Sequence, residues 1–125
     1  MKRLKPLLKQ KVEELERQHP GGMVILVSMA GLKYIYVSDT VHDLLGYKPS
    51  HFVGQRVSRF AVDEYEPHLR ITMQDALLTG ESIEVNIRFK TKSGMVQPVH
   101  AMIRRVIDPE TNEVYLLSWV EAADR

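Results

Sequence analysis

The sequence predicts an α+β fold in which helices cover an antiparallel sheet. The clearest sign is the strict alternation of apolar and polar side chains over residues 83–90, which indicates a strand with one buried and one wet face. Two further strands, 95–107 and 114–120, follow through short turns. A helix, a strand pair and several short helices precede these three strands, which gives five strands in all.

Residues 6–18 are expected to form a helix, because their apolar residues repeat at helical spacing and form one narrow stripe. Pro6 suits the first helical turn, and the His-Pro-Gly-Gly run at 19–22 cannot continue a helix. We therefore expect residues 1–20 to be a flanking helix with a linker, and residues 21–125 to be the globular domain.

A hairpin and a short helix are expected next. Residues 24–27 and 34–37 are rich in β-branched and aromatic side chains, as in buried strands. Ser38 and Asp39 are typical helix caps, so they are expected to begin a short helix that Gly46 ends.

Two more helical segments lead to the long strands. A helical turn is expected from Pro49 to near Gly54, and a longer helix from about Pro67 to Gly80. Three acidic residues near the start of the longer helix complement its dipole, and this interpretation is preferred to a catalytic or cation-binding cluster. These residues are Asp63, Glu64 and Glu66.

Composition excludes several classes of protein. The 125 residues are 44% hydrophobic and 26% charged, which matches a globular domain. The formal net charge of +1, with both signs interspersed, does not favour direct contact with nucleic acid or membrane. There is no cysteine, hence no disulfide and no thiol nucleophile. A cytoplasmic location is expected, or a nuclear one for a transcription regulator.

Five short segments together carry a resemblance to a known family. They read Tyr-Ile-Tyr-Val-Ser at 34–38, Leu-Leu-Gly-Tyr-Lys-Pro at 44–49, Phe-Val-Gly-Gln at 52–55, Leu-Thr-Gly-Glu-Ser at 78–82 and Thr-Lys-Ser-Gly at 91–94. With these segments the chain resembles the PAS family of sensory and interaction domains over about residues 23–121. The resemblance implies a five-stranded antiparallel sheet that cups helices around a small interior. Residues 60–67 depart from the His-Pro-Asp-Asp-like run of many members, so that loop is expected to differ.

The resemblance implies a regulatory module of a larger signalling protein, such as a transcription regulator or a sensor kinase. Such a module dimerises, contacts other proteins or senses a small ligand. An enzyme is not expected, because no serine elbow, phosphate loop or paired-carboxylate motif stands out. No metal site is expected either, since the histidines show no i, i+4 pair.

If a ligand is bound, we expect it to be small and largely apolar, and no cofactor is predicted. The candidate cavity residues, which could equally be plain core, are Tyr36, Leu45, Val57, Phe60, Met73, Leu77, Ile87, Phe89, Ile103 and Leu117. The light-sensing branch of the family forms a flavin adduct through a cysteine in a Gly-Arg-Asn-Cys-Arg-Phe motif. The corresponding segment here, 54–60, carries Val57 at the cysteine position, so that adduct is excluded.

A haem-based or other cofactor sensor is the alternative. The oxygen-sensing branch of the family places its iron ligand on the long helix, and His68 lies near that position. An exposed histidine is the simpler interpretation, because His68 follows Pro67 in the first turn and lies between charged residues. Val85 also stands near the place where that branch offers an arginine.

The last strand carries apolar residues on both faces, so it needs two covers. The second cover is either the N-terminal helix of the same chain or another protomer. In that helix basic residues crowd the start and acidic residues the end, which opposes the helix dipole and favours antiparallel pairing with a second copy. A homodimer, or pairing with another PAS domain, is therefore predicted through Leu4, Leu8, Val12, Leu15, Met102, Val106 and Trp119.

Deleting residues 1–18 is expected, on this interpretation, to shift the molar mass from dimer toward monomer. Two alternatives stay open. The helix could mask the sheet face of its own chain, or it could be a solvated basic stretch of an upstream linker.

Overall fold

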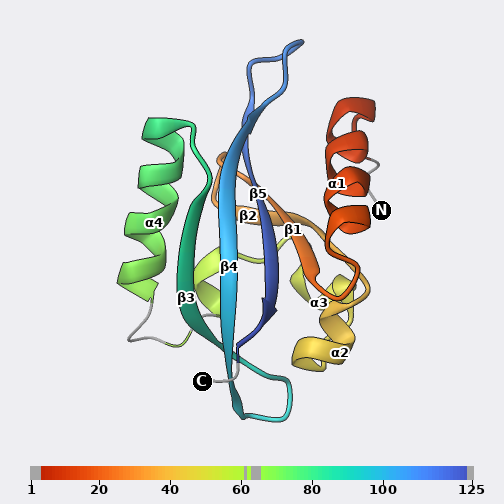
Figure 1. Cartoon of the computed structure of the whole chain (residues 1–125), viewed down its shortest axis with the longest axis vertical. Coiled ribbons are helices and arrows are strands. Elements are labelled where there is room, and N and C mark those ends of the chain that lie inside the picture. The colour runs from red at the N-terminus through yellow and green to blue at the C-terminus, as the bar shows by residue number, and fades with distance from the viewer. Residues whose placement is uncertain (1–3, 61, 63–65, 124–125) are drawn as a thin grey trace.

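The computed structural model describes residues 4–60, 62 and 66–123 of the chain. Figure 1 shows its elements. The helices are α1 (Pro6–Gln18), α2 (Val41–Leu45), α3 (Pro49–Phe52), the 3₁₀ turn η1 (Val57–Arg59) and α4 (Glu66–Thr79). The strands are β1 (Met23–Ser28), β2 (Lys33–Val37), β3 (Ile83–Lys90), β4 (Val96–Ile107) and β5 (Val114–Ala122). Each predicted helix and strand is present.

The five strands form one antiparallel sheet in the order β2-β1-β5-β4-β3, which confirms the predicted fold class. Two hairpin-linked groups, β1–β2 and β3–β4–β5, meet in the middle of the sheet where β1 pairs with β5. The helical segment between β2 and β3 carries the chain from one edge of the sheet to the other. No helix in the described part of the chain is long and apolar enough to cross a bilayer.

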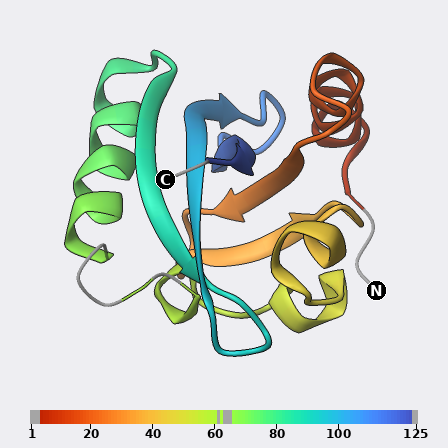
Figure 2. The ribbon, with the colours of Figure 1, turned by 60° about the horizontal axis from the view of Figure 1, so that its bottom comes forward.

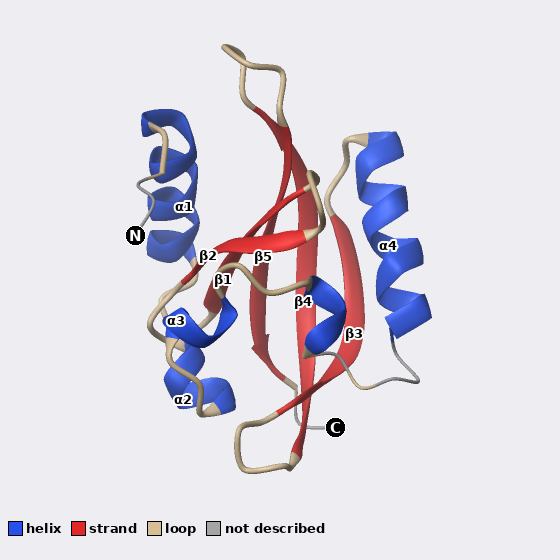
Figure 3. Ribbon diagram, turned by 180° about the vertical axis from the view of Figure 1, so that it is seen from behind, coloured by secondary structure: helices blue, strands red, loops and turns tan. Residues whose placement is uncertain are grey.

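The sheet has a core on each face. On the inner face, α2, α3 and α4 cover one cluster of buried side chains, and on the outer face α1 covers a second cluster (Figures 2 and 3). Successive residues of β5 alternate between the two clusters: Leu116 belongs to the inner one and Leu117 to the outer one. The prediction that the last strand is covered on both sides is therefore confirmed, and the outer cover is α1 of the same chain.

The hydroxyl groups at the start of α2 do not cap the helix as predicted. The N-cap residue is Thr40, and no side-chain bond caps the helix. The Oγ of Ser38 instead accepts the N–H of Val24 at 2.8 Å, while Thr40 Oγ1 donates to the carbonyl of Gly22 at 2.9 Å. Because these backbone groups lie at the buried start of β1, satisfying them outweighs capping a five-residue helix. Gly46 ends the helix in a left-handed conformation, as predicted.

The end of α4 is locked against β4 by an arginine. Arg105 donates from its guanidinium to the carbonyl of Leu77 at 2.8 Å, which satisfies one of the last carbonyls of the helix. Gly80 has a φ of +71°, and a Cβ there would lie 2.6 Å from the Arg105 guanidinium. The glycine thus supplies both a left-handed turn and room for the arginine.

Replacing Gly80 with alanine is therefore expected to lower the free energy of unfolding by about 2 kcal/mol, from the left-handed strain and from displacing Arg105. Gly54→Ala is the matched control, because its φ is +89° and no atom lies within 4 Å of the added methyl group. The control should lose only about 1 kcal/mol. Urea unfolding measures both losses, and equal losses would contradict the role of Arg105.

Candidate functional site

A cavity of about 40 Å³ lies between the inner face of the sheet, η1 and α4. Its walls come from all five strands, η1 and α4, and consist of Ile25, Val27, Tyr34, Val57, Leu69, Met73, Ile87, Phe89, Ala101, Ile103, Leu116, Ser118 and Val120. The two polar side chains in this set hold partners in the protein, since Tyr34 donates to the carbonyl of Val57 and Ser118 to that of Met102. Burial raises the pKa of Tyr34, so its hydroxyl stays neutral. The cavity is therefore apolar and uncharged.

Four aromatic rings pack together in the inner core, and one of them, Tyr34, also lines the cavity. Phe52 and Phe60 stack with their ring centroids 3.9 Å apart, and Tyr34 meets the edge of Phe52 at 5.1 Å. Tyr47 packs edge-on against both phenylalanines, at 5.3 Å and 5.1 Å. Close contacts of this kind leave the cavity little freedom to expand toward these rings.

A groove of about 490 Å³ lies outside the cavity, between the β1–β2 turn, η1 and α4. Val57, Leu69 and Met73 line both the groove and the cavity. Rotation of these three side chains would therefore open a route from solvent to the interior. None of them is charged, and this route is suited to an apolar molecule.

Of the ten predicted cavity residues, five line the cavity: Val57, Met73, Ile87, Phe89 and Ile103. Leu45 and Phe60 belong to the same inner core without lining the cavity, and Leu77 packs at its margin. Tyr36 and Leu117 lie on the outer face, against α1, so their assignment to the interior is corrected. Eight lining residues were not predicted: Ile25, Val27, Tyr34, Leu69, Ala101, Leu116, Ser118 and Val120. Tyr34 is the largest side chain among them. Tyr34 and Tyr36 have the same parity, so simple alternation would place both on one face, but a β-bulge opposite Leu26 and Val27 shifts the register and sends Tyr34 inward and Tyr36 outward.

The residues present in the structure do not fit a haem group. His68, the candidate ligand, is exposed on α4, while its backbone carbonyl accepts a hydrogen bond from Thr72 Oγ1. The cavity of about 40 Å³ is also far below the several hundred Å³ of ordinary cofactor sites. In the described part of the chain, no three His, Cys, Asp or Glu side chains gather to hold a metal ion. Asp63 and Glu64 lie outside the described residues.

Helix α1 places its apolar stripe on the outer face of the sheet. Leu8, Val12 and Leu15 are each 2% exposed, and they pack against Val24, Leu26, Val106, Tyr115 and Leu117. Leu4, Met102 and Trp119 lie half-buried at the margin of this cluster. The predicted interface residues are thus brought together, but within one chain. They are available to a second chain only if α1 leaves the sheet, so the dimer stays a prediction.

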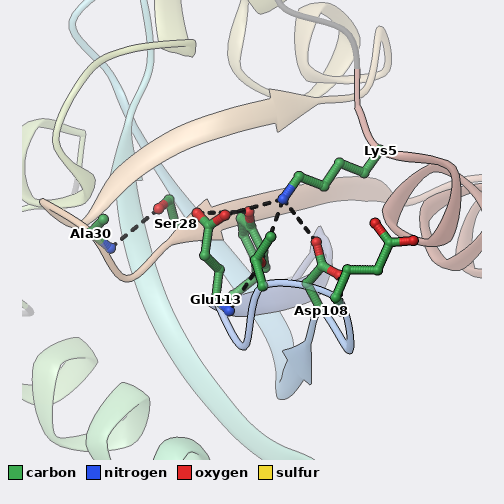
Figure 4. A network of polar contacts seen from close by, with 8 residues as sticks. Lys5, Ser28, Ala30, Asp108 and Glu113 are labelled. Atoms are coloured by element: carbon green, nitrogen blue, oxygen red, sulfur yellow. Dashed lines mark hydrogen bonds and ion pairs between the residues drawn. The ribbon is translucent and has the colours of Figure 1, made fainter.

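Polar contacts hold both ends of α1. At its start, Lys5 Nζ lies 2.9 Å from Asp108 and 3.1 Å from Glu113, in the β4–β5 turn (Figure 4). Near its end, Tyr36 donates to Glu16 at 2.8 Å, and beyond it the rings of His19 and Trp119 pack with their centroids 4.1 Å apart and their planes tilted by 36°. The basic start of α1 therefore faces acidic groups of its own chain, which compensates the unfavourable order of charges along the helix.

Replacing Lys5 with methionine is expected to flatten the acid dependence of stability. The hydrogen bond from Lys5 holds the pKa of Asp108 and of Glu113 below their ordinary values of 3.8 and 4.5. A carboxyl with a lowered pKa stabilises the fold above its ordinary value, and this contribution is lost as the pH falls through the folded-state pKa. The wild type should therefore melt higher than the variant above the ordinary pKa values of the two carboxyls, and the two should converge as the pH falls far enough to protonate both carboxyls in the folded state.

Thermal unfolding across this pH range measures the difference. Lys9→Met is the control, because Lys9 is exposed and its nearest carboxylate, Glu13, is 4.0 Å away. Curves for wild type and Lys5→Met that stay parallel down to the lowest pH would contradict the ion pairs.

Known proteins share the arrangement of strands and helices described above. A family model described as the PAS fold matches residues 34–120. No curated protein matches the chain. Several solved structures share its fold at low sequence identity.

Three of these structures illustrate the range of sequence identity and TM-score. A light-oxygen-voltage domain studied with a flavin analogue has 20% identity and a TM-score of 0.75, with 93% of this chain and 86% of that chain covered. The PAS-B domain of Drosophila melanogaster Cycle with bound glycerol has 16% identity and a TM-score of 0.73, with 81% and 99% covered. A sensory box histidine kinase/response regulator from Burkholderia thailandensis has 12% identity and a TM-score of 0.67, with 89% and 83% covered.

Proposed function

Because the chain belongs to the PAS fold family, in which the domains are sensory, we propose that it is a non-enzymatic regulatory module whose output is carried by α1 on the outer face of the sheet. One observation supports this most directly: β5 contacts both the interior cavity and α1. Leu116, Ser118 and Val120 line the cavity, while Leu117 and Trp119 pack in the α1 cluster. A displacement of β5 by a molecule in the cavity would therefore change the contacts between β5 and α1.

Occupation of the interior is the input in this proposal. The cavity of about 40 Å³ has room for a very small apolar molecule, and anything larger must push its walls apart. A molecule that binds better when β5 is displaced shifts the population toward that state. The polar contacts at the ends of α1, formed by Lys5 and Glu16, are partly solvent-exposed and can be replaced by water.

Release of α1 is the output. It would uncover the apolar side chains of β1, β4 and β5 that α1 now buries, which is a surface suited to a second copy or to another PAS domain. The same module serves either a transcription regulator or a sensor kinase, and the histidine kinase neighbour is an example of the second context. Dimerisation in this proposal belongs to the released state.

An enlarged cavity tests the coupling. Met73→Ala removes most of a buried side chain from the cavity wall, and benzene binds such apolar cavities. Benzene is expected to raise the melting temperature of this variant, to speed amide hydrogen exchange in α1, and to shift the emission of Trp119, the one tryptophan of the chain. Ile71→Ala is the control, because Ile71 is on the same helix but 57% exposed.

Chemical shifts of the Ile87 and Ile103 methyl groups report whether benzene is bound in the cavity. Bound benzene that leaves the α1 amides and Trp119 unchanged would contradict the coupling. The same α1 response in Ile71→Ala would show that benzene acts elsewhere, which also contradicts it.

A further inference from the structure

The end of β4 that leads into the β4–β5 turn has an unpaired edge. The β3–β4 ladder begins at the pair Ile83–Ile103, whereas the β4–β5 ladder continues to Ile107–Val114. Residues 104–107 therefore pair with β5 on one side, and β3 does not reach them on the other (Figure 1). In an antiparallel strand with one partner, alternate residues direct their N–H and C=O groups away from that partner. Such groups are a template for another strand.

This edge lies in a groove of about 430 Å³. Leu7 and Lys11 of α1 form one wall, and Gly80 and Ser82, in the connection from α4 to β3, contribute to the other. Residues 104–107 form the floor. The groove thus occupies the position that β3 would fill if it were longer. We name it the β4-edge groove.

The β4-edge groove is positively charged. Lys11, Arg104 and Arg105 line it, and none of the described residues that line it is acidic. The Nε of Arg104 is buried and has no hydrogen-bond partner in the described part of the chain. Arg105 is held in place through its bond to the carbonyl of Leu77. The groove therefore offers fixed cationic groups to an anionic occupant.

Apolar groups lie beside these charges on both faces of the strand. Val106 is buried beside α1, Leu7 is half-buried, and Ile107 is 44% exposed on the opposite side of the strand. An incoming strand directs successive side chains to opposite faces of the sheet. Arg104 shares the outer face with Val106 and α1, whereas Arg105 shares the inner face with Ile107. A segment in which acidic and aliphatic residues alternate can therefore meet Arg104 and Lys11 on one face and Ile107 on the other.

We propose that the β4-edge groove is a docking site for an extended acidic peptide segment of a partner protein, which adds to the sheet as a strand beside residues 104–107. Backbone bonds along the edge would supply affinity, and Lys11 and Arg104 would select for acidic side chains. This docking site is additional to the interior and needs no ligand there. Because α1 forms one wall, the peptide binds the docked state of α1 and favours it.

The test titrates a short peptide of alternating glutamate and valine into the full chain. Binding is expected to slow hydrogen exchange at alternate amides of residues 104–107, and to weaken with added salt. Two control peptides are used, one with lysine in place of glutamate and one N-methylated at alternate residues. Neither should bind comparably, because the first reverses the charge and the second cannot donate along the edge.

Matched variants locate the site. Lys11→Glu and Arg104→Glu should each weaken the peptide by roughly fivefold or more. Lys9→Glu makes the same change of charge on an exposed part of α1 outside the groove, and it should leave the affinity nearly unchanged. Far-ultraviolet circular dichroism confirms that each variant is folded.

Several results would overturn the proposal. Absence of binding would mean that the cations only protect the edge from pairing. Equal losses of affinity for the peptide in Lys9→Glu and Lys11→Glu would indicate a nonspecific charge effect. Unchanged binding of the N-methylated peptide, or full competition by inorganic phosphate, would show an anion site rather than strand addition.

Discussion

Replacing Val12 with aspartate is expected to detach α1 from the sheet and to lower the free energy of unfolding by about 3 kcal/mol. Val12 is 2% exposed in the centre of the outer cluster, and a carboxylate there has no partner to offset its burial. The cost is limited because α1 can move into water while the inner core stays folded. Urea unfolding measures the loss, and amide hydrogen exchange shows whether it is confined to α1.

The matched control is Gln10→Asp, which adds the same charge on the exposed side of α1. It should change the free energy of unfolding by less than about 0.5 kcal/mol. Equal stability of Val12→Asp and the wild type would mean that α1 is not packed on the sheet in solution.

The same packing reverses what the sequence alone predicted for loss of residues 1–18. The sequence interpretation expects a shift from dimer toward monomer. Since Leu8, Val12 and Leu15 cover their own sheet, their removal exposes the outer cluster and should promote self-association instead. Sedimentation of the truncated chain over a range of concentrations distinguishes the two.

Replacing Phe52 with alanine should cost about 3–5 kcal/mol. Phe52 is fully buried, and its ring stacks on Phe60 and meets the rings of Tyr34 and Tyr47. Its removal leaves a void in the inner core that rigid neighbours fill poorly. Guanidinium unfolding and the near-ultraviolet circular dichroism of the tyrosines measure the effect.

Val53→Ala is the neighbouring control, because Val53 is 38% exposed and should lose less than about 1 kcal/mol. A loss below about 1 kcal/mol for Phe52→Ala as well would contradict the close packing of the four aromatic rings.

The elements that could be predicted from sequence are those with an unambiguous pattern. In β3 the alternation of side chains matches the alternation of burial, and α1 has the predicted bounds because proline and the Gly-Gly run delimit it. In β2 and β5, by contrast, apolar side chains point to both faces. The parity of β5 could not be assigned, so Leu117 was placed in the interior. In β2 a β-bulge, which periodicity does not reveal, puts Tyr34 and Tyr36 on opposite faces, so Tyr36 was placed in the interior and Tyr34 was not.

The cover of the outer face could not be predicted for a different reason. The order of charges in α1 indicates a missing partner, and the nearest explanation along the sequence is another copy of the helix. The actual partners of Lys5 are Asp108 and Glu113, and Glu113 is 108 positions away along the chain. Such a contact follows from the path of the β4–β5 hairpin, which periodicity does not encode. Likewise, Ser38 resembles a helix cap but satisfies the start of β1.

The most direct test of the central claim is isotope-filtered nuclear Overhauser spectroscopy on a mixture of ¹³C-labelled and unlabelled protein. If α1 covers the sheet of its own chain, contacts between the methyl groups of Val12 and Leu117 appear only within labelled molecules. The same contacts observed between labelled and unlabelled molecules would show that α1 covers the sheet of a second chain, and they would contradict the account.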